Sequence, residues 1–227
     1  PNNIQDLPEQ IENLLKGKTN LRSININGKL TKADLIKILE PIKRNRDSHI
    51  RGLEFSVSDF HSEELDTIAD VVSNTNIKTV GFHDALSNSD SMDTYFYTTF
   101  LSPGVTKTLY CLNLENTYNL DVERLFPKLS KVRFLSLANC DLEITNVLTK
   151  IPLIVQSRLL ELNLSGNRVS DEKFIDESIQ FPGFLRSLIL NDISWPTDSL
   201  QLFLYQVFKK IPKHLKLSLS NTTMDQN

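Results

Sequence analysis

An eleven-residue frame that recurs along the chain constrains this sequence more than any other feature. Its clearest copy runs from Leu159 to Val169, with apolar residues at frame positions 1, 4, 6 and 11 and Asn167 at position 9. The alternation of Leu162 and Leu164 with polar residues predicts a short strand that buries one face and exposes the other. A short polar side chain at position 9 can hydrogen-bond backbone groups of the turn that leaves the strand.

Copies of this frame begin near residues 21, 50, 77, 109, 132, 159, 185 and 214, at intervals of 23 to 32 residues. The copies are followed by apolar residues at helical spacing, as in the stripe Leu65, Ile68, Ala69 and Val72. A unit of this length cannot bury its strand face and its helix face alone, so neighbouring units must stack. We therefore predict a single repeat domain over residues 1–227.

The two ends of the sequence indicate a longer array. Residues 4–16 have the spacing of a helix with no strand before it, and the last copy of the frame lacks a polar closing element. The chain also opens at Pro1 without an initiator Met. We expect a fragment or processed product of a longer repeat protein.

The frame resembles that of the leucine-rich repeat superfamily, most closely over residues 132–142 and 159–169. The unit length is similar to that of the long-repeat, ribonuclease-inhibitor-like subclass. The run from Leu162 to Asn167 also looks like the CARMIL-type subset of actin-regulatory scaffolds. The resemblance implies an α/β solenoid: a right-handed horseshoe with parallel strands on the concave face and helices on the convex face.

Two further groups of residues are interpreted as core. Cys140 occupies position 9, which this frame accepts alongside Asn, so we expect a buried packing thiol rather than a nucleophile. An aromatic cluster follows the third copy of the frame, and we expect convex-side packing there rather than a ligand site. Its members are Tyr95, Phe96, Tyr97 and Phe100.

Composition excludes several classes of function. The chain has 227 residues and a formal net charge of −3, which argues against a broad nucleic-acid surface. No apolar run is long enough to span a bilayer. Only Cys111 and Cys140 are present, so the sequence implies no disulfide framework and favours a reducing, cytoplasmic location.

The sequence contains no motif typical of a catalytic, cofactor or metal site. Its four histidines form no zinc-protease motif, two cysteines at unrelated frame positions cannot make a four-ligand zinc site, and the glycine patterns of nucleotide loops are absent. We therefore predict a protein that is not an enzyme and needs no cofactor. A hydrolase on a repeat scaffold is a remote alternative, which substitution of His83 or Cys111 would test.

Residues at frame positions 3, 5, 7 and 8 are expected to line the concave surface, because positions 1, 4 and 6 point inward. We predict that this surface binds a protein partner. The residues that we expect to bind it are Glu54, His83, Cys111, Asn113, Glu115, Phe134, Ser136, Glu161, Asn163 and Ile189.

This predicted surface is mildly acidic. Its charged members, with position 8 included, are Glu54, Asp84, Glu115, Glu161 and Asp192 against Lys216. Phe134 is a large aromatic residue where solvent is expected, one strand away from Glu115 and Glu161. Aromatic anchors flanked by polar groups are typical of interaction hot spots. The alternative is that Phe134 only packs on neighbouring side chains.

The sequence thus favours a non-enzymatic interaction scaffold whose concave face binds a protein with a basic patch. The superfamily resemblance implies an alternative, a regulator of a GTPase or of actin assembly like the CARMIL or tropomodulin proteins. Fold does not settle this choice, because one fold supports many functions.

Overall fold

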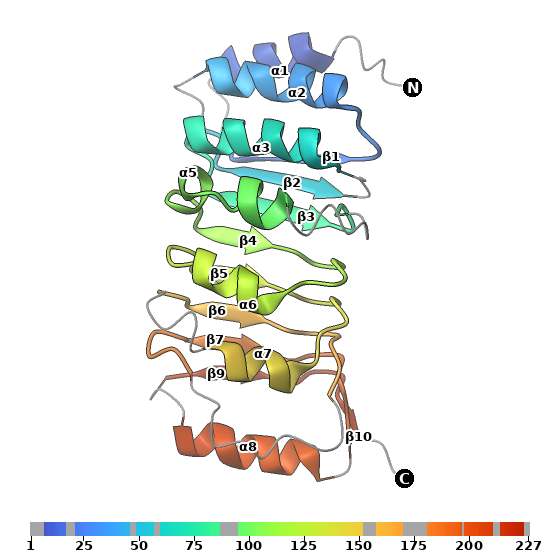
Figure 1. Ribbon diagram of the computed structural model, residues 1–227, viewed down its shortest axis with the longest axis vertical. Helices are drawn as coiled ribbons and strands as arrows, with labels where there is room; N and C mark the ends of the chain where they lie inside the picture. The colour runs from blue at the N-terminus through green and yellow to red at the C-terminus, as the bar shows by residue number, and fades with distance from the viewer. Residues whose placement is uncertain are drawn as a thin grey trace. The chain divides into compact units, whose positions relative to one another are not determined.

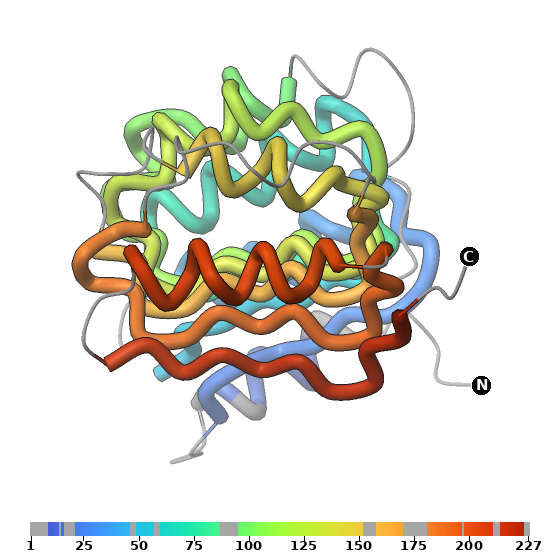
Figure 2. The backbone as a smooth tube through the Cα atoms, turned by 90° about the horizontal axis from the view of Figure 1, so that it is seen from below, coloured from blue at the N-terminus to red at the C-terminus, as the bar shows by residue number. Residues whose placement is uncertain are grey.

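The computed structural model describes residues 7–16, 21–45, 49–56, 60–86, 95–151, 158–169, 181–196, 198–210 and 214–224. The chain divides into two compact units, Pro1–Cys111 and Leu112–Asn227. In each unit, short parallel strands follow one another in chain order and are accompanied by helices (Figure 1). Figure 2 shows the strands and the last helix of the second unit in separate layers. Residues 170–180, where the repeat pattern predicts the helix of the sixth unit, lie outside the described residues.

The first unit contains three five-residue strands and the helices around them. Its elements are α1 (Leu7–Lys16), β1 (Ser23–Asn27), α2 (Lys32–Arg44), β2 (Gly52–Ser56), α3 (Ser62–Asn74), β3 (Thr79–His83), the π-helical turn η2 (Phe96–Phe100) and α5 (Pro103–Thr106). The parallel register places Ile26 beside Phe55 and Phe55 beside Phe82, all at frame position 6. All three are buried, as the frame predicts.

Thr31 and Asp34 form a capping box at the start of α2. The Thr31 hydroxyl oxygen accepts a hydrogen bond from the Asp34 backbone N–H (3.2 Å), and the Asp34 carboxylate accepts one from the Thr31 N–H (3.2 Å). This reciprocal pair satisfies backbone donors that the first helical turn leaves unpaired. The hydrogen bonds from Thr31 lower the pKa of the Asp34 carboxyl.

Aromatic rings form the core of the first unit. The Phe82 ring lies 5.1 to 6.1 Å, centroid to centroid, from those of Phe55, Phe60, Phe96 and Phe100. Edge-to-face and stacked rings at such distances are favourable beyond their area burial. The core interpretation of the aromatic cluster is therefore confirmed for Phe96, Tyr97 and Phe100, which are buried, but Tyr95 is 45% exposed.

The second unit carries shorter strands. Its elements, with β4 beginning at the boundary, are β4 (Cys111–Asn113), α6 (Val122–Leu125), the 3₁₀ turn η3 (Phe126–Lys128), β5 (Phe134–Ser136), α7 (Ile144–Lys150), β6 (Glu161–Asn163), β7 (Ser187–Ile189), β8 (Ser194–Trp195), α8 (Ser199–Lys210), β9 (Lys216–Ser218) and β10 (Thr223–Met224). Leu135, Leu162 and Leu188 are aligned on adjacent parallel strands and buried. The predicted stacking of like units is confirmed here. The fold is an α/β leucine-rich repeat solenoid.

The turn that leaves the strand has a positive φ at the same frame position in all seven copies where that position is described. Frame position 8 has φ between 51° and 119° in seven copies: Gly28, Asp84, Asn116, Asn139, Gly166, Asp192 and Asn221. This left-handed region favours glycine and, among other residues, Asn and Asp. The position-8 N–H of Asn139 donates to the Ser165 carbonyl of the next repeat (2.8 Å), and that of Gly166 donates to Asn191 (2.9 Å).

Asn167 at position 9 confirms the predicted role of that residue in the turn. Its side chain is 4% exposed. Its Oδ1 accepts hydrogen bonds from the backbone N–H groups of Cys140 (3.1 Å) and Leu142 (2.9 Å) of the preceding repeat. Its amide nitrogen donates to the carbonyls of Leu137 (2.7 Å) and Leu164 (2.9 Å). One side chain thus joins two repeats at their turns.

Cys140 is buried, in agreement with its interpretation as a packing residue. Its thiol donates to the carbonyls of Leu114 (3.0 Å) and Ala138 (3.3 Å). Burial raises the pKa of the Cys140 thiol to about 12.

This burial predicts a large difference in reactivity between the two cysteines. At pH 8 the Cys140 thiolate is scarcely populated, and thiolate is the reactive species. Iodoacetamide should therefore modify the partly exposed Cys111 in the folded protein and leave Cys140 intact. Intact-mass spectrometry should show one adduct before unfolding in guanidinium and two after it. Two rapid adducts in the folded protein would contradict the burial of Cys140.

Candidate interaction surface

The ten residues predicted to bind a partner are all partly exposed. They occupy frame positions 3, 5 and 7, which we call the outward strand face. In the first unit these are Glu54, His83 and Cys111. In the second unit they are Asn113, Glu115, Phe134, Ser136, Glu161, Asn163 and Ile189. The structure brings some of them into contact, and each unit is described in turn.

Glu54 and His83 form a pair across β2 and β3. The Glu54 Oε2 lies 2.9 Å from the His83 Nε2, and about a quarter of each side chain is exposed. The pair passes over Gly81, whose Cα is aligned with that of Glu54. A Cβ on residue 81 would lie 1.5 Å from the Glu54 Oε2, so only glycine leaves room for this contact. The sequence placed Glu54 and His83 on one face but did not indicate that they touch.

Cys111 and His83 are not arranged as a nucleophile and its base. The Cys111 N–H donates to the Lys78 carbonyl (3.0 Å), which places Cys111 at the level of Thr79. His83 lies four residues farther along, roughly 13 Å at 3.3 Å per residue. An activated nucleophile requires a base within hydrogen-bonding distance. This geometry gives the hydrolase alternative no support.

The outward strand face of the second unit consists of two aligned rows. Frame position 3 contributes Phe134, Glu161, Ser187 and Lys216, and position 5 contributes Ser136, Asn163, Ile189 and Ser218. Phe134 and Glu161 are therefore neighbours on β5 and β6, as predicted. Ile189 stands among polar residues of its row and is partly exposed.

Hydrogen bonds link the small polar side chains of this face into a ladder, which we define as Ser136, Asn163, Ser165, Asn191 and Ser218. The Asn163 amide donates to the Ser136 hydroxyl (3.3 Å), and the Ser165 hydroxyl donates to the Asn163 Oδ1 (2.7 Å). The Asn191 N–H donates to the Ser165 hydroxyl (3.2 Å), and the Ser218 hydroxyl donates to the Asn191 Oδ1 (2.8 Å). The ladder restrains these rotamers, so a partner would not have to immobilise them.

Three members of the ladder, Ser165, Asn191 and Ser218, were not among the predicted site residues. The sequence signal was the recurrence of Ser and Asn at positions 5 and 7 of successive repeats. This recurrence did not predict the hydrogen bonds, because cross-strand partners become visible only once the register is known.

The acids at position 8 also have a role in the turn. Asp84 and Asp192 are exposed, and their backbone is left-handed, with φ of 51° and 55°. The turn itself favours Asp at this position. The presence of Asp at position 8 is therefore explained by the turn, and it does not indicate that a partner is basic. Glu115 and Glu161 are the carboxylates of the outward strand face in the second unit, and both are partly exposed.

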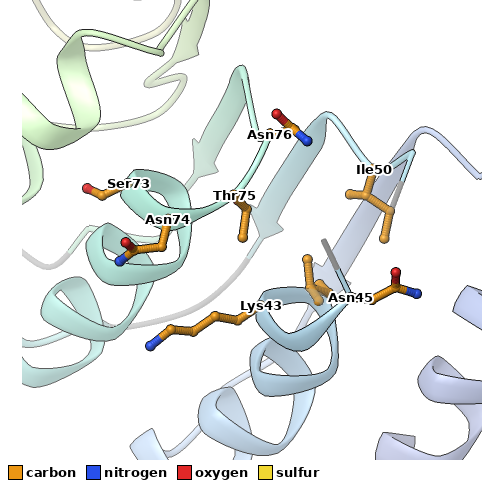
Figure 3. Close-up of a pocket in the computed structure, with 8 residues that line it drawn as sticks. Lys43, Asn45, Ile50, Ser73, Asn74, Thr75 and Asn76 are labelled. Carbon is orange, nitrogen blue, oxygen red and sulfur yellow. The ribbon is translucent and has the colours of Figure 1, made fainter. Parts of the chain in front are cut away.

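A pocket of about 410 Å³ lies in the first unit, near the C-terminal ends of α2 and α3 (Figure 3). Its lining consists of Ile42, Lys43, Asn45, Ile50, Ser73, Asn74, Thr75 and Asn76. Polar groups there are already engaged: Lys43 pairs with Asp70 (2.5 Å), and the Asn74 amide donates to the Asp70 carbonyl (2.8 Å). None of the predicted site residues lines this pocket.

Within the described ranges, no group of three or more His, Cys, Asp or Glu residues is arranged to hold a metal ion. None of the described helices has the length and apolar character needed to cross a membrane.

Comparison with known proteins supports the fold. No family model and no curated protein matches this chain. Among solved structures, it is similar to an internalin from Listeria monocytogenes, with a TM-score of 0.51 and 14% sequence identity over 95% of this chain. The chain spans 58% of the length of that internalin. Because the identity is low, this likeness concerns the fold alone. Sequence frames, strand register and structural neighbour agree that the chain has the leucine-rich repeat fold.

Proposed function

We propose that the protein is a non-enzymatic interaction scaffold and that the outward strand face of its second unit binds a protein partner. This face corresponds to the concave side of the predicted horseshoe. The observation that carries the proposal is the position of Phe134, a partly exposed aromatic ring aligned with Glu161 and followed by the Ser/Asn ladder. An aromatic anchor on a pre-organised polar surface is the usual composition of a hot spot and its surroundings.

The chemistry of the face favours a protein over other ligands. The ladder is neutral, and its hydroxyl and amide groups suit the mixed polar contacts of a protein surface. The carboxylates of Glu115 and Glu161 would attract a basic patch and repel a phosphate backbone. A cytoplasmic location is part of the proposal, and it is supported by the two free cysteines.

The alternative function, a regulator of a GTPase or of actin assembly, has one supporting observation. Helices α2, α3 and α8 have 13, 13 and 12 residues, which suits the long-repeat, ribonuclease-inhibitor-like subclass. Capture of binding proteins from cytosol loaded with GDP or with a non-hydrolysable GTP analogue distinguishes a GTPase regulator from a general scaffold. A GTPase regulator should retain a GTPase in one nucleotide state, whereas a general scaffold should capture the same partner in both.

Replacing Phe134 with Ala and Glu161 with Lys should weaken partner binding by about thirtyfold or more, because a hot spot contributes about 2 kcal/mol or more. The partner is first identified by quantitative mass spectrometry of captured proteins. Its affinity for each variant is then measured by calorimetry.

The matched control removes an aromatic ring and reverses an acid on the helices of the same unit, with Phe208→Ala and Glu123→Lys. Both residues are exposed. The control should bind as the unchanged protein does, and circular dichroism should show that both variants are folded. Equal affinity of the Phe134/Glu161 variant and the unchanged protein would refute the proposed site.

A further inference from the structure

Basic residues gather where the strands of the second unit begin. We call this group the strand-start edge. Its members are Lys131, Arg133, Arg158, Arg186 and Lys216. Each lies within three residues before a strand or at its first residue, and Glu161 is the one carboxylate among the described residues of these starts. This is opposite in sign to the chain as a whole, which has a net charge of −3.

Backbone hydrogen bonds place these starts side by side. The Arg133 carbonyl accepts from the N–H groups of Leu160 (2.8 Å) and Glu161 (3.0 Å). The Leu160 carbonyl accepts from Arg186 (2.7 Å), and the Arg186 carbonyl accepts from Lys216 (2.8 Å). The basic residues thus lie on neighbouring strands, which are about 4.8 Å apart in a sheet.

The strand ends of the same unit have the opposite charge. The acidic residues that follow the strands are Glu115, Asp141, Glu143 and Asp192. Arg168 is the described cation there, and it is already paired with Asp141 at 2.6 Å. Charge in this unit is therefore polarised along the strands, positive where they begin and negative where they end.

The cations of the strand-start edge are accessible. Lys131, Arg158, Arg186 and Lys216 are exposed, and none of them has a carboxylate partner among the described residues. The Arg186 guanidinium donates to the carbonyls of Gly183 (3.3 Å) and Leu185 (3.2 Å), which restrain it without neutralising it. Like charges held this close repel one another, and a bound anion would relieve that repulsion.

We infer that the strand-start edge binds an acidic polypeptide segment. Carboxylates of an acidic segment can pair with the exposed cations, which lie on neighbouring strands about 4.8 Å apart. Phe184 precedes the Arg186 strand and is 56% exposed, so it offers a contact for one apolar residue of the segment. Single-stranded nucleic acid is disfavoured, because it requires a series of stacking rings and an uninterrupted basic track. Here Leu160 and Glu161, at the start of β6, separate the basic residues of the neighbouring strands.

The test uses a fluorescein-labelled peptide of Glu and Ser with one central Phe, in fluorescence anisotropy at low salt. The peptide should bind the whole chain, and raising the salt to about 0.3 M should weaken binding strongly, because exposed charges are screened. Arg158→Gln with Arg186→Gln should raise the dissociation constant about fivefold to tenfold. The matched control, Arg124→Gln with Arg168→Gln, removes the same charge elsewhere in the unit and should change it less than twofold.

Other outcomes would overturn the inference. Tighter binding of an oligonucleotide of equal charge would assign the edge to nucleic acid, and binding only to vesicles rich in phosphatidylserine would assign it to a membrane. Peptide binding that is absent, or unaffected by Arg158→Gln with Arg186→Gln, would exclude the site. Phe134→Ala should leave peptide binding intact, so this result is independent of the proposed function.

Discussion

Replacing Phe82 with Ala should lower the free energy of unfolding of the first unit by about 3 to 5 kcal/mol, the usual loss when a buried phenylalanine is truncated in a core. Phe82 is fully buried, and its ring contacts four other phenylalanine rings. The surrounding rings come from β2, from the isolated bridge residue Phe60 and from the η2 turn, so they cannot close on the space without moving the backbone. The loss of stability therefore has two parts: the hydrophobic free energy of burying the ring, and the cost of the cavity that remains.

Urea denaturation followed by tyrosine fluorescence and circular dichroism measures this loss. Phe82→Leu is the matched control, because it keeps most of the apolar volume and should cost about 1 to 1.5 kcal/mol. A loss below 1 kcal/mol for Phe82→Ala would show that the ring cluster is not the core of this unit.

Replacing Asn167 with Ala should destabilise the second unit by about 3 to 4 kcal/mol, because each buried donor left without a partner costs about 1 to 3 kcal/mol. Two backbone donors would lose their acceptor, the buried N–H of Cys140 and the half-buried N–H of Leu142. The carbonyls of Leu137 and Leu164 would lose their donor as well. Urea denaturation measures the free energy. Hydrogen exchange should show faster exchange at the amides of Cys140 and Leu142.

The same frame position in another repeat provides the control. Thr117 also occupies position 9, but its buried hydroxyl has no hydrogen-bond partner among the described residues. Thr117→Val replaces this hydroxyl with a methyl group of similar size and should be neutral or stabilising by up to about 1 kcal/mol. If Asn167→Ala and Thr117→Val changed stability equally, the hydrogen bonds of Asn167 would not be the cause of its effect.

The repeat frame predicted much of this fold, because strand register follows directly from it. The alignment of Leu135, Leu162 and Leu188 needed only the spacing of apolar residues, since each unit must bury the same face. The burial of Asn167 and Cys140 followed from their shared position in the turn. The short pair β8 and β10, in which Trp195 is aligned with Met224, was not predicted, because two-residue strands leave no periodic pattern.

The candidate site was less predictable, because its contacts depend on neighbouring repeats. The Glu54–His83 contact requires the missing side chain of Gly81 on the adjacent strand. The role of the acids at position 8 cannot be assigned from residue type, because Asp both suits a left-handed turn and carries charge. The basic strand-start edge was not predicted, because its members fall at different frame positions, with Arg133 and Arg186 at position 2 and Lys216 at position 3, and they come together only when the strands align. The binding roles of Phe134 and Glu161 stay predictions.

The recurring turn at position 8 also affects which changes in repeat length such a sequence can accept during evolution. Frames in this chain recur after as few as 23 and as many as 32 residues, yet a residue with positive φ stands at position 8 in all seven copies where that position is described. Insertions and deletions between a turn and the next frame therefore leave the strand alignment unchanged. Evolution can lengthen or shorten one repeat and keep the recognition residues in phase, so such arrays tolerate length variation while they acquire new partners.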